Sequence, residues 1–208
     1  MSTSRPYRSN LREERALETR VRIRRSARQL FAKNGFSETT IAEIAEDAGV
    51  APQTIYAVFG SKGGIVAAIL EDLEETARQD ARVAEMIAEE DPPQQLRLFV
   101  SWIRTLYEQG APVIRAALAA QSDPDVAALS NRGDENRLRG TGQITQIWAK
   151  RRALREDLKQ DEAAQRLWLL TSVEQYLLAT DKLGWSPAQY EQWLGDLLEH
   201  ELLNPRRP

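Results

Sequence analysis

The sequence predicts an all-α protein with about nine helices, arranged as a small N-terminal domain and a larger helical domain after it. Apolar residues recur at helical spacing along most of the 208 residues, and no stretch shows the sustained period-2 alternation of a β-strand. Residues that begin and end helices divide this pattern into short helices near the N-terminus and longer ones after them. No internal repeat or low-complexity tract interrupts it.

The first two helices are bounded by local signals. Apolar residues from Ile23 to Phe31 mark the first, and Gly35 ends it, because glycine readily takes the left-handed conformation of a helix cap. The second begins after Thr40, which has capping-box spacing to Glu43, and ends at Gly49. It is therefore only about two turns long.

The third helix starts at Pro52, a residue suited to the first turn of a helix, and ends at Gly60. Apolar residues from Ile65 to Leu73 mark a fourth helix. We expect it to reach Ala88, because the prolines that follow Asp91 break a helix.

Most of the remaining helices are expected to be longer. Residues 96–107 follow i, i+3, i+4, i+7 spacing and lead to a helix end at Gly110-Ala-Pro112, with a short helix at 112–121 after it. Residues 124–152 form a weaker helix with a kink or break in its first half, because three glycines interrupt it. The last two helices span about 161–182 and 187–203. The second of these opens with Ser186, Pro187 and Gln189.

The composition excludes several kinds of catalytic and metal site. The chain has no cysteine, so disulfides, thiolate nucleophiles and iron–sulfur clusters are excluded, and its single histidine is His200. Helical di-iron proteins need Glu-x-x-His pairs, but Leu197 stands three residues before His200 and no second histidine exists. The carboxylate pairs Glu74-Glu75 and Glu89-Glu90 lie in charged runs typical of solvated helix faces. We therefore predict no enzyme, no cofactor and no bound metal.

No apolar run reaches the roughly 18 to 20 residues that a transmembrane helix needs. The sequence at the N-terminus is rich in arginine, unlike the apolar core of a signal peptide. We therefore expect a cytoplasmic protein that does not bind a membrane.

Positive charge is concentrated near the N-terminus. The first 37 residues hold three acidic and ten basic residues, although the whole chain has a net charge of −3. The ten are Arg5, Arg8, Arg12, Arg15, Arg20, Arg22, Arg24, Arg25, Arg28 and Lys33. This distribution favours a polyanionic partner, and an arginine-rich helix face exposed to solvent is the alternative.

The segment Thr39–Lys62 has the pattern of a helix-turn-helix. Two short helices are joined at Gly49, which permits a sharp turn, and Ala45 is small enough to lie where they cross. The residues expected to face inward are Ile44, Ala45, Val50, Ile55 and Phe59. Such a unit places its second helix in the major groove of DNA, whereas a helical hairpin in some other domain is the alternative.

With its flanking residues, this motif resembles the DNA-binding domain of the TetR family of bacterial transcriptional regulators. The matching positions are Gly35-Phe36, Thr39-Thr40-Ile41, Ile44-Ala45, Ala48-Gly49-Val50, Thr54-Ile55-Tyr56, Phe59, Ser61-Lys62 and Ile65. Two positions depart from the family pattern. Ala51 replaces the Ser or Thr that often caps the recognition helix, at a cost of about 1 kcal/mol, and Val58 stands where His or Tyr commonly meets a phosphate.

The resemblance implies a basic arm at 1–17, a DNA-binding domain at 18–62 and a ligand-binding and dimerisation domain at 63–208. Double-stranded DNA is then the partner of the helix at 52–58. The residues expected at that interface are Thr40, Pro52, Gln53, Thr54, Tyr56, Ala57 and Lys62. Gln53 can read adenine through two hydrogen bonds, whereas Lys62 contacts the phosphate backbone. The arm with Arg5, Arg8, Arg12 and Arg15 either follows the minor groove or remains disordered.

The resemblance also implies that the C-terminal helices enclose a small-molecule pocket and form a homodimer. The expected pocket residues are Trp102, Ile103, Leu106, Tyr107, Leu118, Ile147, Trp148 and Tyr176. The expected dimer residues are Trp168, Leu177, Tyr190, Trp193, Leu194, Leu197 and Leu198, and packing inside the chain is the alternative for about half of them.

Together these implications describe a ligand-responsive repressor that binds a palindromic operator as a dimer and is released by a small-molecule effector. The alternative is a DNA-binding or architectural protein that responds to no ligand. Operator binding that is insensitive to every effector would favour that alternative.

Overall fold

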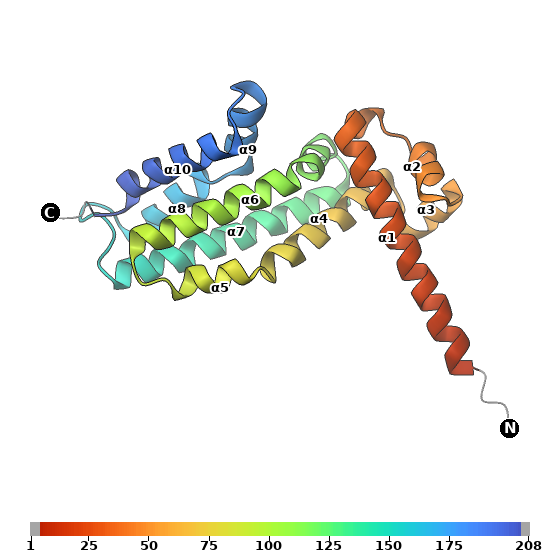
Figure 1. The fold of residues 1–208 in the computed structure, drawn as a ribbon, viewed down its shortest axis with the longest axis horizontal. Coiled ribbons are helices and arrows are strands. Elements are labelled where there is room, and N and C mark those ends of the chain that lie inside the picture. Colours follow the sequence, from red (N-terminus) through yellow and green to blue (C-terminus); the bar gives the residue numbers. More distant parts are fainter. Residues whose placement is uncertain (1–4, 205–208) are drawn as a thin grey trace. The chain divides into compact units, whose positions relative to one another are not determined.

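The computed structural model describes residues 5–204, with side chains from residue 13 on except that of Arg78. Over these residues the chain consists of helices and the segments that connect them (Figure 1). The described residues contain no β-strand, only one isolated β-bridge. The predicted all-α fold is confirmed. The helices form two compact units. The first unit comprises the described residues up to Leu73 together with Pro112–Ser130, and the second comprises Glu74–Ala111 together with the described residues from Asn131 on.

The first unit begins with α1 (Arg5–Glu38), which is kinked at Gly35, where φ is 81°. Residues 5–17, expected to form a separate arm, are instead the first part of this helix. The physical reason is composition, since Leu, Arg, Glu and Ala dominate residues 11–18 and all of them favour helix. The side chains of Arg5, Arg8 and Arg12 lie outside the described ones.

Helix α1 is followed by α2 (Ile41–Ala48), α3 (Pro52–Phe59) and α4 (Lys62–Arg78). The predicted capping box is present, because the Glu43 amide donates to Thr40 Oγ1 over 3.2 Å and the Thr40 amide donates to Glu43 Oε2 over 2.8 Å. Gly49 has φ 63° and ψ 44°, the left-handed cap predicted from the sequence. Ala51 caps α3 without a side-chain hydrogen bond, as expected.

One apolar core holds these short helices together. Its members come from every helix of the first unit, including the parts of α6 (Pro92–Ala119) and α7 (Pro124–Lys150) that belong to it. They are Ile23, Ala27, Phe31, Ile44, Ala45, Ala48, Ile55, Phe59, Ile65, Val66, Ala68, Ile69, Val113, Ala116, Ala117, Ala120 and Val126. Because α2 and α3 have eight residues each, their stability depends on this burial rather than on helix propensity.

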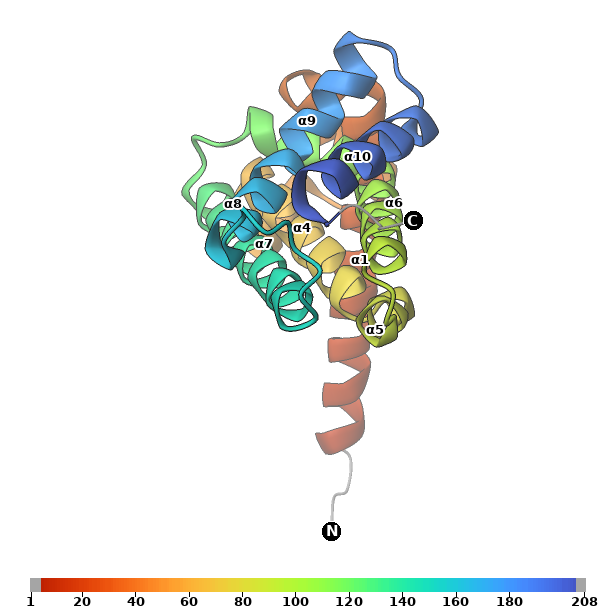
Figure 2. The same cartoon turned by 90° about the vertical axis from the view of Figure 1, so that its left-hand side faces the viewer.

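The second unit contains α5 (Ala81–Ala88), most of α6 and α7, α8 (Gln160–Leu170), α9 (Val173–Leu177), the π-helix η1 (Leu178–Lys182) and α10 (Pro187–Leu202). Figure 2 shows α10 between α6 and α8. Ion pairs join α10 to both neighbours: Arg104 Nε of α6 lies 2.7 Å from Glu191 Oε2, and Arg166 Nη1 of α8 lies 2.9 Å from Glu201 Oε2.

Buried polar groups on α6 and α7 of this unit are connected in series. Trp148 is fully buried and donates from Nε1 to Gln95 Oε1 over 2.8 Å, and Gln95 Nε2 donates to the Met86 carbonyl oxygen over 2.8 Å. The indole N–H of Trp148 and the side-chain amide of Gln95 therefore both have hydrogen-bond partners inside the core.

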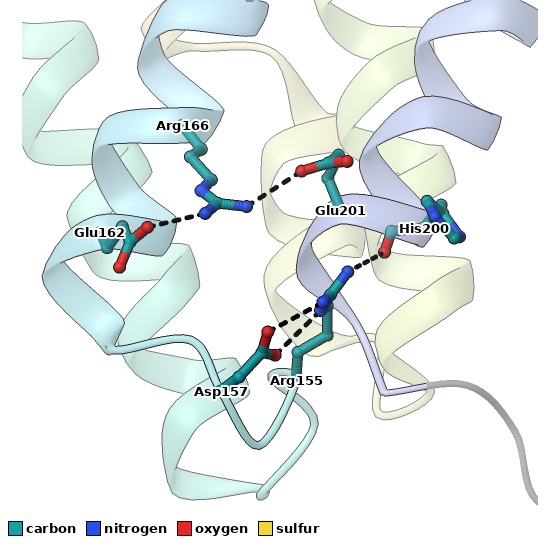
Figure 3. Close-up of polar contacts among 6 residues, drawn as sticks. All are labelled: Arg155, Asp157, Glu162, Arg166, His200 and Glu201. Atoms are coloured by element: carbon teal, nitrogen blue, oxygen red, sulfur yellow. Dashed lines mark hydrogen bonds and ion pairs between the residues drawn. The ribbon is translucent and has the colours of Figure 1, made fainter.

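The connection from α7 to α8 pairs with the chain at the end of α10. Arg155 donates from its amide to the Leu202 carbonyl over 3.0 Å, and Leu154 and Leu203 form the isolated β-bridge. Arg155 also binds the Asp157 carboxylate and the carbonyl of His200, and Arg166 bridges Glu162 and Glu201 (Figure 3). The His200 side chain is exposed, and the described residues contain no cluster of acidic residues or histidine able to hold a metal.

Several predicted helix ends are wrong. Helix α6 continues through Pro112 to Ala119, because Ala111, Val113, Ala116 and Ala117 prolong its buried face beyond the proline. Helix α7 runs unbroken through its three glycines. The fourth helix ends at Arg78, since Asp80 caps a separate α5, and the predicted helix at 161–182 divides into α8, α9 and η1.

Among the described residues, no single helix is long and apolar enough to cross a membrane. Only the pair of α3 with Lys62–Ala77, bent by 59° at the break between them, passes the same test of length and composition.

The start of α4 is packed too closely to accept a side chain at Gly64. A Cβ there would collide with the Phe59 carbonyl oxygen, whereas a Cβ at Gly140 of α7 meets nothing. We predict that Gly64→Ala lowers the free energy of unfolding by about 1 to 3 kcal/mol through overpacking. The matched variant Gly140→Ala should raise it by about 0.5 to 1 kcal/mol. Thermal unfolding followed by circular dichroism checks both, and equal effects would contradict the packing described.

Candidate nucleic-acid interface

Helix α3 divides into a buried face and an exposed face. Ile55 and Phe59 point into the core of the first unit, and Pro52, Gln53, Tyr56 and Ala57 are exposed, with 55% of Tyr56 accessible to solvent. Thr54 is half-buried. The exposed residues lie mainly in the first turns of the helix, the part that reaches base edges in helix-turn-helix complexes. The predicted base-reading residues therefore share one accessible surface, apart from the half-buried Thr54.

Thr40 is exposed at the N-terminus of α2, but its hydroxyl is already engaged. Thr40 Oγ1 accepts from the Glu43 amide and donates to Glu43 Oε2 over 2.9 Å. Hydrogen bonds from Thr40 hold the pKa of the Glu43 carboxyl below its usual value. A phosphate contact by this hydroxyl would therefore have to compete with a carboxylate.

Lys62, expected to contact a DNA phosphate, instead contacts carbonyl oxygens of its own chain. Its ammonium donates to the carbonyl oxygens of Phe36 over 2.7 Å and Thr39 over 2.8 Å, and it lies 4.2 Å from the centre of the Phe36 ring. Burial lowers the pKa of Lys62. The cation therefore joins the start of α4 to the turn between α1 and α2 rather than standing free for a phosphate.

The basic residues of α1 have two roles in the structure. Arg20 donates from Nη1 to the Val58 carbonyl at the C-terminal end of α3 over 3.3 Å and stacks on Phe59, and Arg24 pairs with Asp72 over 2.9 Å. Arg22, Arg25 and Arg28 are exposed. A charge run in the sequence does not distinguish arginines that make internal contacts from those accessible to a polyanion, so the contact of Arg20 with α3 could not be predicted from charge alone.

A second unpredicted contact involves Asp123, in the turn between α6 and α7. Ser61 Oγ donates to Asp123 Oδ2 over 3.0 Å and accepts from the Gly64 amide over 2.8 Å. A Cβ at Gly63 would collide with the Asp123 side chain, so this position requires glycine. The sequence signal was the pair Gly63-Gly64 at a helix start, where glycine is otherwise unfavourable.

The predicted pocket residues are dispersed. Leu118 belongs to the first unit and the others to the second. Trp148 is satisfied by Gln95, and the Tyr107 hydroxyl donates to the Thr171 carbonyl over 2.7 Å. Burial raises the pKa of Tyr107 to about 12. Ile103 is buried, and Trp102, Leu106 and Ile147 are half-buried.

The structure does bring two predicted pocket residues together. The ring centres of Tyr107 and Tyr176 lie 5.7 Å apart, and Tyr190 packs edge-on against Tyr176 at 5.1 Å. Arg104, on the same helix as Tyr107, is paired with Glu108 and Glu191.

The predicted dimer residues are largely core. Tyr190, Leu194 and Leu198 have no exposed surface within one chain, and Leu177 is also buried. Helical spacing identified this face of α10 correctly as apolar, but spacing does not distinguish burial within a chain from burial between chains. Trp168 and Leu197 are half-buried. The exposed apolar side chains of this segment are Leu169, Leu178, Leu183 and Trp193.

Comparison with known proteins assigns the first unit to a family. Residues 23–69, which span the end of α1 through the first half of α4, match the profile described as "Bacterial regulatory proteins, tetR family". The chain carries the DNA-binding domain of the TetR family. TtgR of Pseudomonas putida, an HTH-type transcriptional regulator, is 44% identical over 80 residues, which is 38% of each chain. UidR of Escherichia coli is 31% identical over 115 residues, 55% of this chain and 58% of UidR.

A solved structure extends the likeness to a transcriptional regulator beyond the DNA-binding domain. A transcriptional regulator from Saccharomonospora viridis, in complex with choline, superposes with a TM-score of 0.76 over 90% of this chain and 99% of that chain, at 26% identity. The curated relatives above are matched over less than two thirds of their own length.

The partners of Lys62 lead to a prediction that distinguishes a structural from a DNA-binding role. Lys62→Met keeps the aliphatic stem but removes the donors for two carbonyls. We expect it to lower the free energy of unfolding by about 1 to 3 kcal/mol, because charge-assisted hydrogen bonds are lost. Thermal unfolding checks this, with the exposed Lys33→Met as the control. An unchanged melting temperature combined with a reduced salt dependence of DNA binding would instead make Lys62 a phosphate contact.

Proposed function

We propose that this chain is a ligand-responsive transcriptional repressor that binds a palindromic operator as a homodimer and dissociates when a small-molecule effector binds. The observation that carries the proposal is the exposed face of α3 on a TetR-family helix-turn-helix core. Operator binding would place the protein with the chromosome in the cytoplasm.

The chemistry of that face supports base reading. Gln53 presents a carboxamide, which can form two hydrogen bonds to adenine, and it is exposed in the first turn of α3. Tyr56 and Ala57 offer apolar surface for thymine methyl groups or sugar, and Arg22, Arg25 and Arg28 supply exposed positive charge on α1.

The effector-binding part of the proposal is supported by a structural relative that binds a small molecule. The Saccharomonospora viridis regulator holds choline on a chain that this protein matches almost completely. A ligand-independent DNA-binding protein is the alternative, and operator binding unchanged by any effector would favour it.

The homodimer part rests on exposed apolar surface. Leu169, Leu178 and Leu183 are each more than half exposed, and Trp193 is 38% exposed, although large apolar side chains are normally covered. Leu169 lies at the end of α8, Leu178 and Leu183 lie at the two ends of η1, and Trp193 lies in the middle of α10, outside its buried face. We therefore assign the dimer contact to these residues, together with the half-buried Leu197 and Trp168.

Gln53→Ala tests base reading. We expect the variant to bind the operator more weakly by about 1 to 3 kcal/mol while it binds random duplex as the unmodified protein does, because a base contact carries sequence information and a phosphate contact does not. Fluorescence anisotropy with operator and scrambled duplex measures both affinities.

One control variant accompanies that test. Gln143→Ala removes an exposed glutamine from α7 and should change neither affinity. Equal losses on the two duplexes for Gln53→Ala would contradict the assignment of this residue to base edges.

The double variant Leu178→Glu, Leu183→Glu tests the dimer surface. Placing two carboxylates in an apolar interface should halve the mass measured by light scattering, because buried unpaired charges are costly. The matched variant Leu138→Glu, which alters an equally exposed leucine of α7, should leave the dimer intact. A dimer that survives the double variant but not Leu138→Glu would move the interface to α7.

A further inference from the structure

Two buried donors in the second unit have no partner. Trp168 Nε1 and the Tyr190 hydroxyl are both inaccessible to solvent and make no hydrogen bond within the described part of the chain. Burying such a group without a partner is unfavourable, and native proteins rarely do it unless a water, an ion or a ligand completes the bond.

Both donors belong to one cluster of side chains. Tyr190 packs against Tyr176, which packs against Tyr107, and the Tyr107 hydroxyl binds the carbonyl of Thr171, three residues after Trp168. Burial raises the pKa of Tyr190, and the groups that act electrostatically on its hydroxyl include Tyr107, Tyr176 and Arg137. We call Tyr107, Arg137, Trp168, Tyr176 and Tyr190 the tyrosine–arginine cluster.

Arg137 closes this cluster on the side of α7. Its guanidinium carbon lies 4.4 Å from the centre of the Trp168 ring, and Nη1 donates to the Trp168 carbonyl over 2.5 Å. Arg137 Nη2 donates to Asp134 Oδ1 over 3.4 Å, and the Asp134 side chain is exposed, so the carboxylate partner within the chain faces solvent. The cluster therefore combines a cation with two unused donors.

The chemistry of these three groups selects one kind of ligand. An indole N–H only donates, so its partner must be an acceptor. A carboxylate supplies acceptors for Trp168 and Tyr190 and opposite charge for Arg137, while the three tyrosine rings offer apolar surface to its body. A cation such as choline would meet the Arg137 guanidinium, which already occupies the face of the Trp168 ring.

We propose that the tyrosine–arginine cluster is the effector subsite and that it binds a small organic carboxylate through Trp168 Nε1, the Tyr190 hydroxyl and Arg137. The inference rests on the proposed effector-responsive function. It adds the chemical class of the effector and the three residues that recognise its charged end, none of which the sequence had selected for that role.

The first experiment measures stability without ligand. Tyr190→Phe removes a hydroxyl that has no partner, so its melting temperature should equal or exceed that of the unmodified protein. The matched control is Tyr107→Phe, which loses the bond to the Thr171 carbonyl and should melt at a lower temperature. If Tyr190→Phe is destabilised as much as Tyr107→Phe, a permanently bound water satisfies the hydroxyl and the proposal is overturned.

The second experiment measures binding by saturation-transfer NMR on the full chain. The probes are acetate, phenylacetate and octanoate, each paired with its neutral amide, and choline and phenethylammonium as cations. We expect a carboxylate to bind about tenfold more tightly than its amide, the value of one charge-assisted hydrogen bond. Tyr190→Phe and Trp168→Phe should each remove most of that preference, and Arg137→Gln should remove it entirely.

The outcomes separate this inference from the proposed function. Equal binding of carboxylate and amide, tighter binding of choline, or a preference that survives all three variants would each overturn the subsite. None of these readouts involves DNA, whereas failure of the proposed function would appear as absent operator binding by a protein whose carboxylate affinity is intact.

Discussion

The structure of the first unit depends on one constraint, the shortness of α2 and α3. Helices of eight residues are not stable alone in water, so each must bury one face against its neighbours, and that burial decides which face remains outside. Ile55 and Phe59 occupy the core, which leaves Gln53 and Tyr56 exposed. Polar contacts then fix the position of the helices, since Arg20 binds the end of α3 and Lys62 binds the turn before α2.

Much of the fold could be predicted because its signals are local. The capping box at Thr40, the left-handed cap at Gly49 and the proline start of α3 each depend on residues within one turn. Helix ends decided by tertiary packing could not be predicted in this way. The sequence predicts a helix end at Pro112, but α6 continues through it because the residues beyond the proline complete a buried face.

The candidate sites also divide into residues that local spacing predicts and residues that only tertiary packing brings together. The exposed residues of α3 follow from helical spacing, so the sequence selected them. The partners of Lys62 come from a turn 23 to 26 residues away in the sequence. Tyr190 and Leu194 are fully buried within a single chain, so they are not available for a contact between two chains. Arg137, Trp168 and Tyr190 converge from three helices, and no motif in the sequence connects them.

In the function proposed above, a dimer of this chain reads DNA with two copies of α3. This is tested by selection of bound duplexes from a random library by the protein, followed by sequencing. We expect an enriched palindrome with half-site centres one helical turn, about 34 to 36 Å, apart, as a two-fold dimer of helix-turn-helix units requires. Recovery of unenriched sequence, or of a single asymmetric site, would contradict it.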